Sequence, residues 1–114
     1  LGKKDFAPGR MLADAGCAVA ISTDFNPGSC MSQNLPLMMN MACLYTGLYP
    51  REALLGVTRW AAQALGFDDM GALLAGKQAD ILILDTPDYR NLLYNFAVPH
   101  TQALIKKGKL VYRR

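Results

Sequence analysis

Apolar and polar positions in the first half of the chain follow helical spacing, interrupted by one run typical of a strand. Residues 8–16 predict a short helix that begins at Pro8 or Gly9 and ends at Gly16. Residues 17–23, CAVAIST, form an uncharged run typical of a strand buried on both faces, as in a parallel sheet. Residues 35–48 predict a helix that is apolar nearly all round, and residues 49–66 predict two helical segments. This alternation of helix and strand is typical of α/β folds.

The pattern changes after the last of these helices, where the chain becomes polar and rich in glycine. Residues 81–85, ILILD, then predict a strand. Further on, Lys107 and Gly108 separate two apolar runs, which indicates a hairpin. We therefore expect two parts, an α/β part over residues 1–66 and an antiparallel β part over residues 67–114.

Composition and charge exclude several classes of protein. The chain has 114 residues, of which 52% are hydrophobic and 18% charged, and such a composition is globular and not disordered. Its net charge is +3, and basic residues gather at the C-terminal end. That cluster is typical of a solvated hairpin end and lacks the interleaved aromatic residues of a nucleic-acid site. The longest apolar run, residues 35–49, is shorter than the roughly 18–20 residues of a membrane span. We expect neither nucleic acid nor a membrane as partner.

The three cysteines, Cys17, Cys30 and Cys43, form no CxxC pair and are odd in number. This pattern fits neither a disulfide framework nor a zinc ribbon. Reduced thiols packed as small apolar groups are the usual alternative, and they favour a cytoplasmic protein.

One carboxylate follows the run typical of a strand. Asp24 precedes residues 25–50, which contain no Asp, Glu, Lys or Arg. In α/β barrels and open sheets, ligands bind at the carboxyl ends of strands, which is where Asp24 falls. A metal ion would keep such a carboxylate ionised. The residues alone leave a second interpretation equally open, in which Asp24 only caps its own turn.

The turn after Asp24 is built from Asn26, Pro27, Gly28 and Ser29. Pro27 fixes one backbone angle, and Gly28 permits a positive φ. Backbone N–H groups near Gly28 and Ser29 would suit an anionic group. The alternative is an ordinary loop in which Asn26 is satisfied by its own neighbours.

Three segments of the chain resemble one known family. They are STDFNPGSC at residues 22–30, with the helices that follow, GALLAGKQADILILD at 71–85 and HTQALIKKGKLVY at 100–112. Together they closely resemble the C-terminal part of the imidazolonepropionase family, within the metal-dependent amidohydrolase superfamily. The resemblance implies a (β/α)8 TIM barrel with a small β-sandwich domain. Residues 1–66 would be the C-terminal part of that barrel, and residues 67–114 would be the C-terminal strands of the sandwich.

The implied activity is hydrolysis of the ring amide of 4-imidazolone-5-propanoate to N-formimidoyl-L-glutamate in histidine degradation. The resemblance implies one Zn²⁺ or Fe ion per site, and it makes Asp24 a metal ligand that also accepts a proton from the attacking water. It places Asn26 and Gly28 on the product and Ser29 on the substrate. Opening a cyclic amide at neutral pH needs activated water, and a metal supplies it by lowering the pKa of water from ~16 to about 7.

The chain departs from the family in its histidines. The family takes further metal ligands from an H-x-H pair and from other histidines, whereas this chain has only His100, which we expect to be structural. A catalytic zinc needs about three protein ligands. We therefore expect the 114 residues alone to be inactive, as one piece of a larger enzyme. A related cyclic amidohydrolase or deaminase and a non-catalytic orphan fragment stay open as alternatives, and so does a homodimer.

Overall fold

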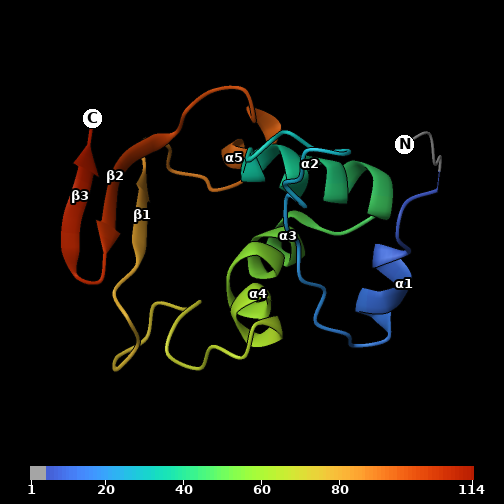
Figure 1. Cartoon of the computed structure of the whole chain (residues 1–114), viewed down its shortest axis with the longest axis horizontal. Coiled ribbons are helices and arrows are strands. Elements are labelled where there is room, and N and C mark those ends of the chain that lie inside the picture. Colours follow the sequence, from blue (N-terminus) through green and yellow to red (C-terminus); the bar gives the residue numbers. More distant parts are fainter. Residues whose placement is uncertain (1–4) are drawn as a thin grey trace.

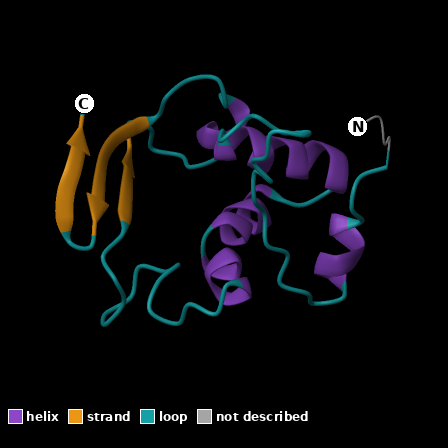
Figure 2. Ribbon diagram, viewed as in Figure 1, coloured by secondary structure: helices purple, strands orange, loops and turns teal. Residues whose placement is uncertain are grey.

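The computed structural model describes residues 5–114, in which a helical part and a three-stranded sheet lie side by side (Figure 1). Figure 2 shows the strands gathered at one end of the molecule and the helices at the other. In chain order the elements are α1 (Gly9–Asp14), α2 (Leu35–Thr46), α3 (Pro50–Val57), α4 (Arg59–Ala64), β1 (Ile81–Leu84), α5 (Asn91–Tyr94), β2 (Thr101–Lys106) and β3 (Lys109–Arg113). The predicted helices and the predicted antiparallel strands are thus both present.

The long helix α2 begins at the predicted residue and ends two residues before the predicted end. Asn34 precedes it, and the Asn34 Oδ1 accepts a hydrogen bond from the N–H of Leu37 at 3.0 Å. This bond satisfies one of the free amides of the first turn. Gly47 follows the helix with a φ of 74°, a left-handed conformation that glycine adopts without steric penalty. These caps confirm the helix predicted over residues 35–48.

Residues 49–66 form two helices, as predicted. Glu52, in the first turn of α3, accepts a hydrogen bond from the N–H of Tyr49 at 2.7 Å. A carboxylate at this end of a helix also interacts favourably with the helix dipole. Thr58 lies between α3 and α4 with φ −122° and ψ −95°, which are not helical angles. The break between the two helices therefore falls at Thr58.

The strand expected over residues 17–23 is not formed. A strand needs a neighbour for its backbone N–H and C=O groups, and the strands of the described chain all lie in the sheet of β1, β2 and β3. The segment packs on α3 instead, where the N–H of Ile21 donates to the Gly56 carbonyl at 2.9 Å. A Cβ at Gly56 would lie 2.8 Å from the carbonyl oxygen of Val19. The missing side chain therefore permits this close approach.

The sheet has the order β1–β2–β3, and both pairs are antiparallel. The hairpin between β2 and β3 turns at Lys107 and Gly108, whose φ angles are 51° and 76°. Two successive positive φ angles are typical of the type I′ turns that close two-residue hairpins. The predicted strand over residues 81–85 and the predicted hairpin are confirmed.

The core of the helical part is small. Met39 of α2, Ala53 of α3 and Leu93 of α5 form one cluster of buried residues. The other buried apolar residues of this part are Ala42, Leu48 and Ala62. The one-turn helix α5 lies in a stretch whose sequence predicts no regular element, and it is held to α2 by a hydrogen bond from Asn40 Nδ2 to the Leu93 carbonyl at 3.0 Å. Although its sequence is apolar nearly all round, α2 is not buried on every side, because Leu44 is 69% exposed. No part of the described chain covers that face.

Within residues 5–114, no helix is both long enough and apolar enough to cross a membrane. The helical elements before the sheet end at Ala64, and the first strand begins at Ile81. The division into domains at residues 1–66 and 67–114 stays a prediction.

Candidate functional site

The Asp24 loop, which we define as residues 24–30, follows residues 17–23, which pack on α3, and precedes the residues that lead into α2. Cys30 closes it from one side. The N–H of Asn26 donates to the Cys30 carbonyl at 2.9 Å, and the N–H of Cys30 donates to the Asn26 carbonyl at 3.3 Å. The Cys30 thiol also donates to the Thr23 carbonyl at 3.0 Å. Sequence reasoning assigned Cys30 only to packing, since no residue spacing marks a thiol as the donor that closes a loop.

The side chain of Asn26 organises the interior of the loop. Its Oδ1 accepts hydrogen bonds from the N–H groups of Gly28 and Ser29, both at 2.9 Å. Its Nδ2 donates to the Asp24 carbonyl at 2.6 Å and to Ser29 Oγ at 3.1 Å. The backbone amides considered as an anion site therefore point at Asn26, and the structure favours the alternative of a satisfied asparagine.

Asp24 has a left-handed backbone with a φ of 49°. Aspartate adopts this conformation more readily than most residues, because its short side chain hydrogen-bonds locally. The residue is exposed, and one carboxylate oxygen, Oδ2, lies 3.4 Å from Asn26 Nδ2. The other oxygen, Oδ1, has no hydrogen-bond partner among residues 5–114. The carboxylate is thus oriented on one side and open on the other.

The structure brings the four predicted site residues together in one short loop. Asp24, Asn26 and Ser29 are linked by side-chain hydrogen bonds, and Gly28 is linked to Asn26 through its N–H. A side chain at Gly28 would place its Cβ 3.3 Å from Asn26 Oδ1, which is a tight contact. The absence of a side chain there therefore suits the hydrogen bonding of the loop.

The donor set around Asp24 is too small to hold a metal ion by itself. Residues 5–114 contain no group of three or more His, Cys, Asp and Glu side chains that could hold a metal. A catalytic zinc site uses about three protein ligands. Asp24 fits the chemistry of one oxygen ligand, and the remaining ligands would have to come from elsewhere.

His100 is a packed residue in the sheet part, as expected. Its Nδ1 lies 3.0 Å from Asp85 Oδ1, and the N–H of Asp85 donates to the His100 carbonyl at 2.9 Å. Arg114 donates to the second oxygen of the same carboxylate at 2.9 Å. These contacts join the end of β1 to the start of β2 and to the C-terminal residue, which is a structural role.

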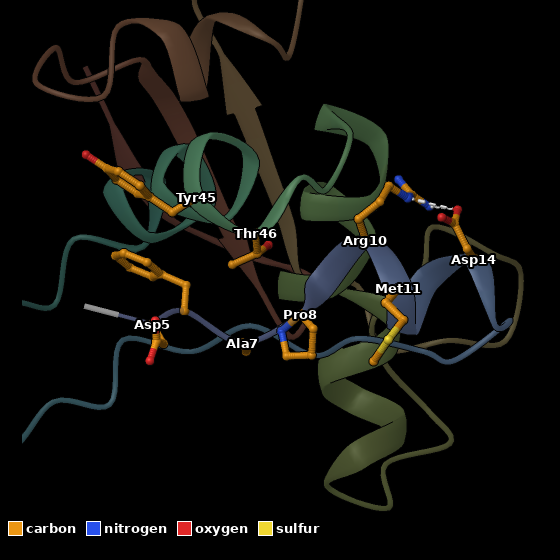
Figure 3. Close-up of a pocket in the computed structure, with 9 residues that line it drawn as sticks. Asp5, Ala7, Pro8, Arg10, Met11, Asp14, Tyr45 and Thr46 are labelled. Atoms are coloured by element: carbon orange, nitrogen blue, oxygen red, sulfur yellow. Dashed lines mark hydrogen bonds and ion pairs between the residues drawn. The ribbon is translucent and has the colours of Figure 1, made fainter. Parts of the chain in front are cut away.

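A pocket of about 720 Å³ lies between α1 and the end of α2 (Figure 3). Phe6 and Tyr45 stack on one side of it, with ring centroids 4.6 Å apart and planes inclined by 9°. Arg10, Met11 and Asp14 line it from α1. None of the residues of the Asp24 loop lines this pocket, so it is separate from the candidate site.

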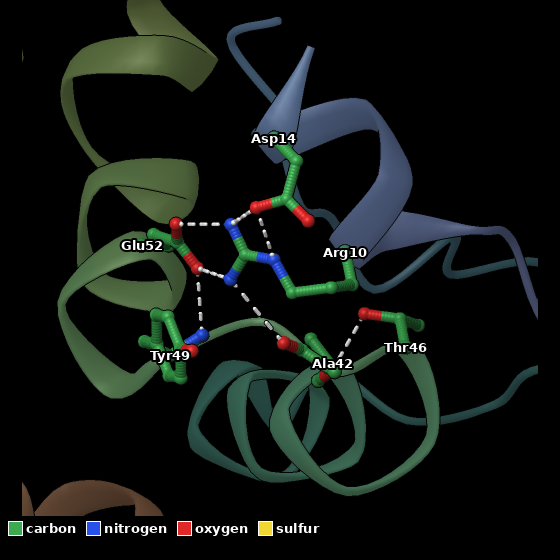
Figure 4. A network of polar contacts seen from close by, with 7 residues as sticks. Arg10, Asp14, Ala42, Thr46, Tyr49 and Glu52 are labelled. Atoms are coloured by element: carbon green, nitrogen blue, oxygen red, sulfur yellow. Dashed lines mark hydrogen bonds and ion pairs between the residues drawn. The ribbon is translucent and has the colours of Figure 1, made fainter. Parts of the chain in front are cut away.

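Arg10, one of the charged residues that line that pocket, is fully paired (Figure 4). The Arg10 guanidinium donates to both oxygens of Glu52, at 2.8 and 2.9 Å, and to Asp14 Oδ1 at 2.8 Å. It also lies 4.6 Å from the centre of the Tyr49 ring. The hydrogen bonds from Arg10 hold the pKa of the Glu52 carboxyl below its usual value. This network ties α1 to the start of α3 and is structural.

The chain matches the family model described as "Amidohydrolase family" over residues 1–111. The match covers nearly the whole chain, and the chain belongs to the amidohydrolase family.

The curated relatives it matches include several imidazolonepropionases. It is 47% identical over 105 residues to the one from Rubrobacter xylanophilus, an alignment that covers 91% of this chain and 25% of that protein. It is 44% identical over 108 residues to the one from Geobacillus sp. (strain WCH70), covering 94% of this chain and 26% of that protein. The predicted resemblance is confirmed, and the chain spans about a quarter of the length of these relatives.

The chain also resembles a solved structure in its fold. The crystal structure of N-isopropylammelide isopropylaminohydrolase from Burkholderia multivorans aligns with a TM-score of 0.61 and 23% sequence identity. The alignment covers 72% of this chain and 21% of that one. At this identity the likeness concerns the fold alone.

Proposed function

We propose that this chain supplies the Asp24 loop to the active site of an imidazolonepropionase. The reaction would be hydrolysis of the ring amide of 4-imidazolone-5-propanoate to N-formimidoyl-L-glutamate. The observation that carries the proposal is the loop itself, in which Asp24, Asn26, Gly28 and Ser29 gather in a chain 40–47% identical to imidazolonepropionases. In the proposed enzyme, residues 1–66 belong to a (β/α)8 barrel and residues 67–114 to a small β-sandwich domain.

Asp24 has two proposed roles. The metal, Zn²⁺ or Fe, would activate water by lowering its pKa. Asp24 would be one of its ligands and would accept a proton from the attacking water, a kind of help worth roughly 10²–10⁴-fold in rate. The open face of the carboxylate supports both roles, because Asn26 Nδ2 engages only Oδ2 within the described chain.

Asn26, Gly28 and Ser29 are the proposed contacts to substrate and product. The resemblance assigns Asn26 and Gly28 to the product and Ser29 to the substrate. Ser29 Oγ lies at the exposed rim of the loop, within 3.1 Å of Asn26 Nδ2. A hydroxyl at that place suits a carboxylate such as the propionate of the proposed substrate. The three free thiols are compatible with a cytoplasmic enzyme.

A hybrid enzyme tests the proposal. The 114-residue chain replaces the segment that it matches in the Rubrobacter xylanophilus relative, so that the remaining ligands come from that relative. We expect the hybrid to bind about one metal ion and to open 4-imidazolone-5-propanoate. The Asp24→Asn variant keeps the size and the left-handed tolerance of the residue but removes its charge, and we expect it to lower kcat by at least about 100-fold.

The matched control is Asp69→Asn, because the Asp69 side chain makes no hydrogen bond or ion pair within the described chain and lies outside the loop. The control should keep the metal content and the activity. Turnover of a hydantoin, guanine or cytosine in place of the imidazolone would favour the related amidohydrolase or deaminase. Unchanged activity in Asp24→Asn would refute the assignment of Asp24, and stoichiometric metal on the isolated chain would contradict its dependence on further ligands.

A further inference from the structure

The Asn26 side chain is saturated by contacts inside the Asp24 loop. A carboxamide offers two N–H donors and one oxygen with two acceptor positions. Both acceptor positions are used by the Gly28 and Ser29 amides, and both donors are used by the Asp24 carbonyl and Ser29 Oγ. A ligand that hydrogen-bonds to Asn26 would therefore have to displace one of these partners.

The conformation of Asp24 depends on this side chain. Asp24 has a φ of 49°, in a region that is sparsely populated for residues other than glycine. Asn26 Nδ2 donates to the Asp24 carbonyl at 2.6 Å and lies 3.4 Å from its Oδ2. One amide group thus contacts both the backbone and the carboxylate of Asp24. Without it, no other described side chain would hold the Asp24 carbonyl in this orientation.

We propose that Asn26 is a positioning residue that fixes the direction of the Asp24 carboxylate toward the metal. This inference rests on the proposed function and deepens it, since it adds a role to the product contact that the resemblance implies. Residues that orient a reacting group affect the rate strongly, because a displacement of about 1 Å costs up to roughly 100-fold. Loss of Asn26 should therefore act on kcat and on metal retention more than on KM.

Two variants separate the two halves of the carboxamide. Asn26→Ala removes the acceptor and the donors. Asn26→Asp keeps an acceptor for the Gly28 and Ser29 amides but replaces the donor to the Asp24 carbonyl with an oxygen. Asn95→Ala is the matched control, because the Asn95 side chain is exposed and makes no hydrogen bond with any described residue.

The first measurement is amide hydrogen exchange in the 114-residue chain. We expect exchange at Gly28 and Ser29 to be about tenfold faster in Asn26→Ala, the change that loss of one hydrogen bond of typical net strength produces. Exchange at both amides should stay close to that of the unchanged chain in Asn26→Asp and in Asn95→Ala. Equal exchange in all four proteins would overturn the proposal.

The second measurement uses the hybrid enzyme and its metal content. Both Asn26 variants should retain less metal and show a kcat lower by roughly 10–100-fold, with KM changed less than about threefold. An increase in KM with kcat and metal content unchanged would make Asn26 a substrate contact only and would overturn the proposal. If the hybrid does not open the imidazolone, the proposed function fails, while metal content and exchange still decide the role of Asn26.

Discussion

At the scale of single residues, some carboxylates in this chain are held by hydrogen-bond donors from several segments. Asp80 is an example, since it accepts hydrogen bonds from the Lys106 ammonium, from the N–H of Lys107 at 2.8 Å and from Gln78 at 2.8 Å. The hydrogen bond from Lys106 is the main cause that lowers the pKa of Asp80 from 3.8 to about 2. Asp80 thereby fastens the polar segment before β1 to the hairpin of β2 and β3.

This contact predicts a dependence of stability on pH. The pKa of Asp80 is lower in the folded chain than in the unfolded one, so its contribution is complete above pH 3.8 and is lost as the pH falls toward about 2. We expect the melting temperature to fall over this range, and to fall less steeply in Asp80→Asn. Thermal unfolding followed by circular dichroism measures the difference, with Asp69→Asn as control. Parallel curves for Asp80→Asn and the unchanged chain would contradict the role of Asp80.

At the scale of elements, the close contact between α3 and residues 17–23 places the Asp24 loop. The Gly56 carbonyl is one of the last in α3, and such carbonyls have no partner inside the helix. The N–H of Ile21 occupies it at 2.9 Å. A glycine at this helical position costs up to about 1 kcal/mol relative to alanine, and the contact with the segment explains why it is tolerated.

Gly56→Ala should therefore destabilise the chain although alanine favours helices. The new Cβ would lie 2.8 Å from the Val19 carbonyl oxygen and 2.9 Å from Ile21 Cδ1. Overpacking of this kind costs about 1–3 kcal/mol, and the gain from alanine in a helix is about 1 kcal/mol, so we expect a net loss of up to about 2 kcal/mol in the free energy of unfolding. Urea unfolding checks the value. Gln63→Ala on the exposed side of α4 is the control and should be neutral or slightly stabilising, and the same result for Gly56→Ala would show that the contact is unimportant.

Local signals predicted the elements that depend on neighbouring residues. Asn34 begins α2, and Lys107 with Gly108 turns the hairpin, because each acts within a few residues. The end of α2 at Gly47 was not predicted, since the predicted helix ran to residue 48. The strand over residues 17–23 was wrong for the described chain, since pairing depends on a second strand that local sequence does not specify. The same limit applies to α5, which is supported by its packing on the distant helix α2.

In the candidate site, too, some features could be predicted from neighbouring residues and others could not. The position of Asp24 after an apolar run could be predicted, and so could the turn residues around it. The saturation of Asn26 and the closing thiol of Cys30 could not, because both depend on the distances between side-chain atoms. The sequence therefore predicts which residues form the loop better than what each of them does there.

At the scale of the whole molecule, the chain is open. It exposes 8196 Å² of surface, whereas a compact folded chain of this size exposes roughly 6100 Å². Its radius of gyration is 14.8 Å, compared with roughly 13 Å for a compact domain of this length. Large apolar side chains contribute to this surface in both parts, among them Leu44, Leu73 and Tyr94. In the proposed enzyme, the rest of the barrel would cover much of it.

We expect the chain to associate when it is made alone, because apolar patches of this kind are typical of interfaces. Sedimentation velocity should give species heavier than one chain. Leu44→Glu places a charge on the exposed face of α2 and should lower the associated fraction, while Gln63→Glu on α4 should leave it unchanged. A monomer at all concentrations would contradict this expectation.

From the position of α5 between β1 and β2 we expect an order in which the strands pair. The hairpin of β2 and β3 closes across two residues and can form within microseconds. Pairing of β1 with β2 closes the longer connection that contains α5, and this closure has a larger entropic cost. We therefore expect β1 to pair with β2 after the hairpin has formed. A C-terminal half made without α2 would lose the helix on which α5 packs.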